Sequence, residues 1–152
     1  MANDLDALED WAGMLLSKLE PAARSKLARS LAQKLRRSQQ QRVKQQRNPD
    51  GSVYAARKPR DLKAKKGRIK RQVKIFQKLP KASYLKAKGD VQSITVGFTG
   101  RVALIARVHQ HGLKDRAEAK APEVKYAQRQ VLGLTEFDLD LIRDGLLTHL
   151  KP

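Results

Sequence analysis

The sequence contains no cysteine among its 152 residues. It therefore has no disulfide framework, no thiolate metal ligands and no cysteine nucleophile, which fits a reducing compartment. Aromatic residues make up only 5%, and no apolar run approaches the roughly 20 residues of a membrane-spanning helix. The acidic start, MANDLDALED, resembles neither a secretory signal nor a transit peptide. These absences predict a soluble intracellular protein.

The length predicts one domain. Domains average roughly 100–200 residues, so the chain is expected to form a single domain over residues 1–152. A chain of this length buries about two-thirds of its unfolded surface, and a hydrophobic fraction of 40% suffices for such a core. The fold therefore needs no covalent cross-links.

Acidic residues are scarce, and their distribution is uneven. The 33 Lys and Arg outnumber the 15 Asp and Glu, which gives a net charge of +18. Residues 1–20 hold one base and five acids, residues 21–88 hold 23 bases and two acids, and residues 89–152 hold nine bases and eight acids. A continuous basic block is typical of a surface that faces a polyanion or an acidic partner. The alternative is a solvated, partly disordered arm.

Apolar residues at helical spacing predict two helices near the N-terminus. The first covers residues 4–19 and the longer second one covers residues 22–46, with Pro21 ending one and opening the other. After Leu35 the second helix is nearly all polar. We therefore expect this part to gain little from packing within its own chain and to project into solvent or lie against another molecule. Asn48-Pro49-Asp50-Gly51 is a strong turn signal.

The middle of the chain is expected to be a flexible basic loop over residues 52–90, because its centre has too few apolar residues for a core. A short helix near residues 69–79 is expected within it. Alternating apolar residues then predict a half-buried strand over residues 91–99. Residues 102–111 are compatible with a strand or a helix, and the position of Gly112 favours a helix.

The C-terminal part predicts a charged loop over residues 113–122, a second strand within residues 124–132 and a final helix. Thr135 and Asp138 form a capping-box pattern at the start of that helix. Together these elements predict an α+β fold. It comprises an N-terminal helical hairpin with one long helix, a small antiparallel sheet, a C-terminal helix and a long basic loop.

Residues suited to catalysis or metal binding are few. His109 and His111 have the only metal-like spacing, and on a helix residues two apart point in different directions. Zinc takes three or four ligands, and no further ligands are placed to complete a site. No nucleophile has a positioned base, and the nine glycines form no phosphate-binding loop. We therefore expect no enzyme activity, no metal and no cofactor.

Nucleic acid is a stronger candidate ligand, because the Lys and Arg residues cluster in one helix and one loop. Base recognition would require a recognition helix or interleaved aromatic residues. The basic stretch offers only Tyr54, Phe76 and Tyr84, which is thin for a stacking platform. Any binding is therefore expected to target the phosphate backbone without sequence preference.

Four short segments stand out by their order and spacing, and together they span almost the whole chain. They are Leu5-Asp6-Ala7-Leu8-Glu9-Asp10-Trp11, Leu35-Arg36-Arg37-Ser38-Gln39 running into Asn48-Pro49-Asp50-Gly51, Gly97-Phe98-Thr99-Gly100-Arg101 followed by Ala106-Arg107-Val108-His109-Gln110-His111-Gly112-Leu113, and Leu132-Gly133-Leu134-Thr135. In this combination the chain resembles the virion morphogenesis (tail completion) family of contractile-tailed phages of the Peduovirus type.

The resemblance implies a structural virion protein at the head-proximal end of the tail, where tube and sheath are capped and joined to the DNA-filled head. Its implied partners are other neck and tail proteins: the tail terminator, tube, sheath and head–tail connector. It also implies a small α+β fold and a homo-oligomeric ring, with six copies as the number set by tail symmetry. Such a ring uses head-to-tail interfaces. The protein would be assembled in the host cytoplasm and reside in the virion, away from any membrane.

Beside this resemblance, two roles for individual residues are predicted. Contact with acidic neighbours or with packaged DNA is assigned to Arg36, Arg37, Arg42, Lys63, Lys65, Lys66, Arg68, Lys70 and Arg71. Subunit packing is assigned to Arg101, Arg107, His109 and Gln110. A non-specific nucleic-acid-binding protein remains the alternative function.

Overall fold

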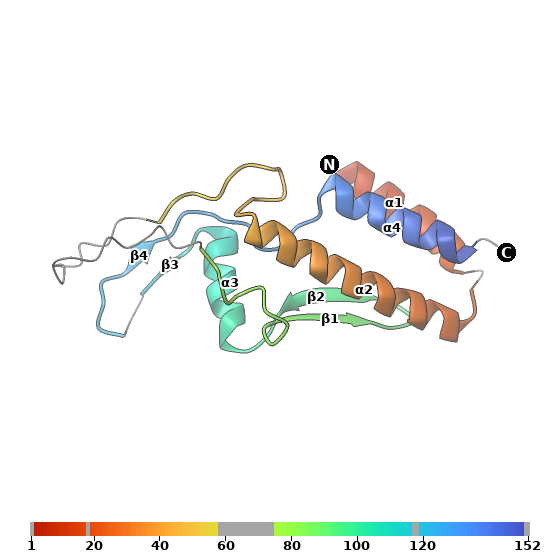
Figure 1. Cartoon of the computed structure of the whole chain (residues 1–152), viewed down its shortest axis with the longest axis horizontal. Coiled ribbons are helices and arrows are strands. Elements are labelled where there is room, and N and C mark those ends of the chain that lie inside the picture. Colours follow the sequence, from red (N-terminus) through yellow and green to blue (C-terminus); the bar gives the residue numbers. More distant parts are fainter. Residues whose placement is uncertain (1, 18, 58–74, 117–118, 151–152) are drawn as a thin grey trace.

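The computed structural model describes residues 2–17, 19–57, 75–116 and 119–150. This part of the chain forms four helices and two small antiparallel sheets, whose arrangement can be followed in Figure 1. In chain order the elements are α1 (Ala2–Leu16), α2 (Pro21–Lys44), β1 (Leu85–Gly89), β2 (Ile94–Phe98), α3 (Arg101–His111), β3 (Lys114–Asp115), β4 (Val124–Lys125) and α4 (Glu136–Leu150). The predicted α+β class is confirmed. None of the described helices is long and apolar enough to cross a membrane.

Helix α2 is the central element of the fold. It packs on one side against α4, which also contacts α1, and carries the β1–β2 hairpin on the other side (Figure 1). Pro21 lies at the start of α2, where a missing N–H leaves no helical carbonyl unpaired. Leu27 and Leu31 of α2 form a core cluster with Leu146 of α4, and Trp11 of α1 packs against it. Both predicted N-terminal helices are therefore present.

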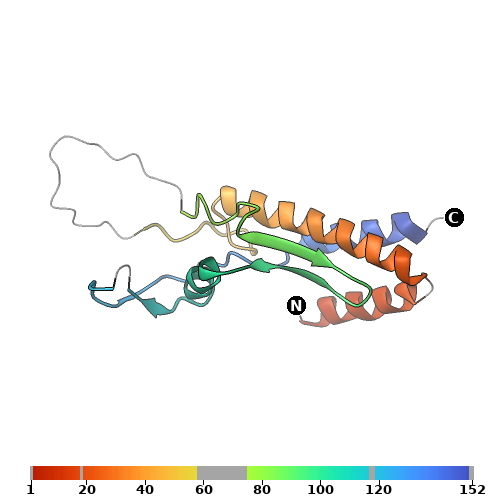
Figure 2. The same ribbon diagram turned by 90° about the horizontal axis from the view of Figure 1, so that it is seen from below.

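The β1–β2 hairpin packs on α2 through one face. Leu85 of β1 pairs with Phe98 of β2 across the antiparallel ladder, and the Leu85 side chain is fully buried. Lys86 and Lys88 point to the other face and are exposed. Figure 2 shows the hairpin running alongside α2, with β1 as the nearer strand. Alternation therefore allows a strand with two lysines to contribute to the core.

Part of the region predicted as one basic loop is ordered, which corrects that prediction. The expected loop over 52–90 contains β1, and the expected strand over 91–99 contains its partner β2. Residues 75–80 form turns rather than the end of the helix predicted for 69–79. Residues 58–74, the centre of the predicted loop, lie outside the described residues.

A second core cluster joins the C-terminal end of α2 to α3. It contains Val43, Leu79, Ala106 and Val131. Helix α3 matches the helix predicted over 102–111. It ends at Gly112, whose φ of 62° is a left-handed conformation that glycine adopts at little cost.

The chain between α3 and α4 contains less regular structure than predicted. Strands β3 and β4 pair over two residues each, so the expected loop over 113–122 includes a short strand. The strand predicted within 124–132 is wrong beyond Lys125. From there the chain crosses the body of the protein and bonds to side chains of α2 and α3 rather than to a neighbouring strand.

Gly89 marks a close approach between the hairpin and α2. A Cβ at this position would lie 2.4 Å from the carbonyl carbon of Ala28, and backbone atoms there have no room to yield. We expect Gly89→Ala to lower the free energy of unfolding by about 1–3 kcal/mol in urea denaturation. Gly97→Ala, whose new Cβ would meet nothing within 4 Å, is the control and should change it by less than about 1 kcal/mol. Equal effects would contradict this packing.

Candidate functional site

A buried guanidinium joins α2 to the crossing segment, residues 129–133. The Arg42 side chain is only 7% exposed. Its Nη1 donates to the carbonyl oxygen of Gln130 (2.8 Å), and its Nη2 donates to the carbonyl oxygen of Val131 (3.1 Å). The same Nη2 donates to Oε1 of Gln39, one turn earlier in α2 (2.6 Å). Burial lowers the pKa of Arg42, and these oxygen acceptors replace the lost water at Nη1 and Nη2, whereas the buried Nε has no hydrogen-bond partner among the described residues.

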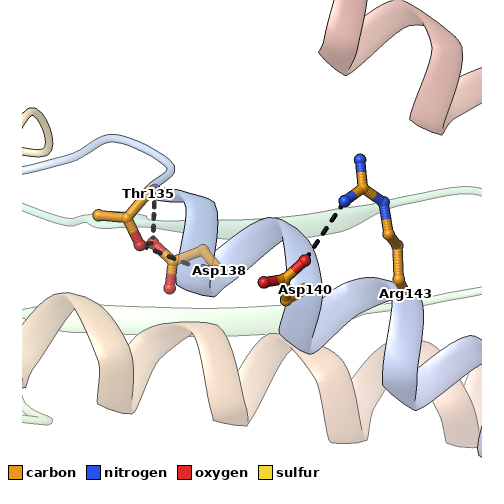
Figure 3. Close-up of polar contacts among 4 residues, drawn as sticks. All are labelled: Thr135, Asp138, Asp140 and Arg143. Carbon is orange, nitrogen blue, oxygen red and sulfur yellow. Dashed lines mark hydrogen bonds and ion pairs between the residues drawn. The ribbon is translucent and has the colours of Figure 1, made fainter.

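Asp138 links the same network to the start of α4. Its side chain is fully buried, and Oδ2 accepts hydrogen bonds from N and Oγ1 of Thr135 (2.9 and 3.0 Å). Oγ1 of Thr135 accepts one in return from N of Asp138 (3.1 Å), so the predicted capping box is confirmed (Figure 3). Ser38 and Gln39 of α2 also donate to the Asp138 carboxylate. The cap therefore positions α4 against α2.

Three side chains that lie outside α2 also make hydrogen bonds to the crossing segment. Oδ1 of Asn48 accepts from N of Gln130 (2.9 Å), and the Tyr54 hydroxyl donates to the Gln130 carbonyl (2.9 Å). Burial raises the pKa of that hydroxyl, which stays protonated as a donor. Oε1 of Gln110 in α3 accepts from N of Val131 (2.9 Å). The backbone N–H groups of residues 129–133 thus all find acceptors without a neighbouring strand.

This network corrects the expectation for the polar half of α2. The helix after Leu35 does not project from the protein, because Gln39, Arg42 and Val43 are buried in their own chain. Arg42, predicted to contact a partner or DNA, turns its guanidinium to the interior. The sequence feature that could have predicted this burial is spacing, because Gln39 and Arg42 continue the three- and four-residue repeat of the apolar residues of α2. Hydrophobicity alone does not reveal this continuation.

An aromatic cluster surrounds His109 of α3. Its ring centroid lies 4.7 Å from that of Phe76 and 5.0 Å from that of Tyr126. Nη1 of Arg129 lies 3.4 Å from its Nδ1, while Nη2 of Arg129 donates to a loop carbonyl (2.9 Å). Desolvation, with the charges of Arg129 and Arg57, lowers the pKa of His109 from 6.5 to about 4. His109 is therefore neutral at neutral pH.

The structure separates the other residues for which roles were predicted. Arg37, Arg101 and Arg107 are exposed, and Arg36 is half-buried. His109 and Gln110 make contacts within their own chain. The predicted contacts Lys63, Lys65, Lys66, Arg68, Lys70 and Arg71 lie outside the described residues. Among those it describes, no group of three His, Cys, Asp or Glu side chains is arranged to hold a metal ion.

Two open grooves lie on the described surface. One, of about 310 Å³, runs between β2 and α3 and is lined by Phe98, Ala106 and Leu132 among others. The other, of about 500 Å³, runs between α2 and α4. The features that the geometry offers are thus surfaces and grooves around a buried polar network.

Comparison with known proteins gives the family. The sequence profile described as the phage virion morphogenesis family matches residues 3–151. The chain belongs to the phage virion morphogenesis family. It is 35% identical over 150 residues to tail completion protein S of Escherichia phage P2, a match that covers 98% of this chain and 99% of that protein. No solved structure gives a significant match. The resemblance inferred from this virion morphogenesis protein's sequence is confirmed.

Arg42 should be essential for stability. Arg42→Met keeps the aliphatic stem but leaves the Val131 carbonyl without its donor and the Gln130 carbonyl with the Tyr54 hydroxyl alone. We expect the free energy of unfolding to fall by about 2–4 kcal/mol in urea denaturation. Arg37→Met, at an exposed position of the same helix, is the matched control and should change it by no more than about 0.5 kcal/mol. If Arg42→Met lowers the free energy of unfolding no more than Arg37→Met does, the network does not stabilise the fold as assigned.

His109 should make stability depend on pH. Because the folded chain keeps it neutral down to about pH 4 while the unfolded chain protonates it near 6.5, the unfolded state binds more protons in that window. Stability should therefore fall as the pH drops from 6.5 to about 4, by about 1–2 kcal/mol, a figure discounted for the partly exposed ring. His109→Phe should flatten this dependence in urea titrations at several pH values, whereas substitution of the exposed His111 by Gln should retain it.

Proposed function

We propose that this protein is a structural component that completes the head-proximal end of a phage tail and prepares it for joining to the head. The observation that supports this most strongly is the nearly full-length match to tail completion protein S, because it covers both chains almost end to end. The family description, virion morphogenesis, fits the same role. The function needs interfaces with other proteins and neither a substrate nor a cofactor.

The proposed working form is a homo-oligomeric ring of six copies, matched to the symmetry of a tail. Its neighbours are the tail terminator, tube, sheath and head–tail connector, and its place is the head–tail junction of the virion after assembly in the host cytoplasm. A rigid subunit suits such a ring, since interfaces must repeat with the same geometry. The buried network of Arg42, Gln39 and Asp138 supports this rigidity.

A second candidate function is non-specific binding of nucleic acid. The observation that favours it is the row of exposed bases on α2 and β1, which includes Arg37, Lys44 and Lys86. Phosphate contacts of this type weaken steeply with salt, by a log–log slope of about −0.9 per neutralised phosphate. Contact with packaged DNA at the head–tail junction is compatible with the ring.

Completion of tails in vitro tests the proposal. A phage with the gene for this chain deleted should accumulate filled heads and unjoined tails, and the purified protein should restore joined, infectious particles when added to the lysate. Electron microscopy and plaque counts measure the recovery. An unrelated basic protein of similar size is the control for a polycation effect and should restore nothing.

Joined particles in the untreated lysate would contradict the proposed function. A protein that binds duplex DNA at physiological salt but leaves the tails unjoined would instead favour the second candidate.

A further inference from the structure

Exposed acidic side chains gather on α1 and α4, which lie side by side on the face of α2 away from the hairpin (Figure 1). We call this surface the acidic side. All its acidic residues are exposed: Asp4, Asp6, Glu9 and Asp10 in α1, and Glu136, Asp140 and Asp144 in α4. Within the described part of the chain one ion pair involves this side, between Arg143 and Asp140 (3.3 Å, Figure 3). The surface is therefore strongly negative in a protein with a net charge of +18.

The spacing of these acids makes neighbouring carboxylates repel one another within one subunit. Glu136, Asp140 and Asp144 follow one another at intervals of four residues, as do Asp6 and Asp10, so each series lies along one face of its helix. Like charges at this spacing destabilise a helix by about 0.2–0.5 kcal/mol per pair. An opposite charge supplied from outside would reverse this repulsion.

Large apolar side chains lie among the acids. Met14 is 72% exposed, Phe137 68% and Leu147 48%. The groove of about 500 Å³ between α2 and α4 is lined by three leucines, by the carboxylates of Asp140 and Asp144 on the α4 side, and by one base, the exposed Lys34, on the α2 side. Apolar surface beside carboxylates suits the aliphatic stem and charged head of a lysine or arginine. The acidic side is thus built like an interface for a basic partner.

The same chain carries a basic surface elsewhere that could serve as this partner in a second copy. We call this surface the basic side. It consists of exposed residues of α2 and of the outer face of β1: Lys26, Arg29, Arg37, Lys44, Lys86 and Lys88. The β1 part of it lies across α2 from α1 and α4, so this part cannot meet the acidic side of its own subunit (Figures 1 and 2).

From these observations we infer that a second copy of this chain is the occupant of the acidic side, which docks on the basic side of its neighbour. DNA would neutralise the basic side alone and would leave Met14, Phe137 and the acids without a partner. A second copy satisfies both surfaces at once. Because the two surfaces differ, the contact is heterologous and repeats from copy to copy, as a ring or an open filament requires. Only the closure into a ring rests on the proposed function.

Charge reversal tests the contact. The acid-reversed variant carries Asp6→Lys, Asp10→Lys and Asp144→Lys, and the base-reversed variant carries Lys26→Glu, Arg37→Glu and Lys88→Glu. Light scattering at about 150 mM salt should find the wild type assembled and each variant monomeric, with self-association weakened about tenfold or more. Mixing the two variants should restore assembly, since the intact acidic side of the base-reversed variant then meets the intact basic side of the acid-reversed variant.

A control variant and a fold check accompany this experiment. Arg116→Glu with Lys125→Glu reverses exposed charges near the β3–β4 ribbon, outside both sides, and should leave the mass unchanged. Circular dichroism must show wild-type helix content for every variant compared.

Three outcomes would overturn the inference: a monomeric wild type, variants that keep the wild-type mass, or folded monomeric variants that do not reassemble on mixing. An effect confined to the base-reversed variant, with loss of DNA binding, would assign the basic side to nucleic acid instead. The tail-completion assay is independent. If the mixed variants regain the assembled mass but the wild-type protein does not restore joined particles in the lysate, the proposed function is refuted and the contact between copies stands.

Discussion

The fold depends on the hydrogen bonds that the buried Arg42 guanidinium makes to the crossing segment. A charged group in the interior costs less when its donors find acceptors, and backbone carbonyls of Gln130 and Val131 provide them here for Nη1 and Nη2. Gln39 extends this arrangement to Asp138 and thereby to the first turn of α4. The helix that builds the acidic side is therefore oriented by a polar network, with the leucine cluster of α2 and α4 supplying the apolar contact.

The predictions from sequence succeeded where periodicity was strong and local. The helices, the turn at residues 48–51 and the Thr135 cap each depend on residues close together in the chain. Strand β1 was missed because its lysines suggested a solvated loop, whereas they occupy only the outer face. The burial of Arg42 was missed because its acceptors lie 88 and 89 residues further along the chain. Pairings at that distance follow from the fold as a whole, and local composition does not encode them.

The candidate surfaces were predicted in part. Composition located the basic block, and the structure shows that its bases divide between an interior role, at Arg42, and an exposed row on α2 and β1. The contacts expected of the cluster around residues 63–71 remain predictions. The acidic side was not foreseen, since its two helices stand at opposite ends of the sequence. It became visible only when α1 and α4 were seen to lie together.

The long reach of the Arg42 contacts also bears on how the protein is made. During synthesis α2 leaves the ribosome well before residues 130–138, so its polar half must wait for partners that are translated late. A chain cut short before Gln130 lacks both these acceptors and α4. It would keep the basic row and the α1 acids but lose the α4 part of the acidic side and the groove between α2 and α4. If copies meet as inferred above, a truncated chain lacks half of one contact surface, so unfinished subunits are expected to stay out of the particle under construction.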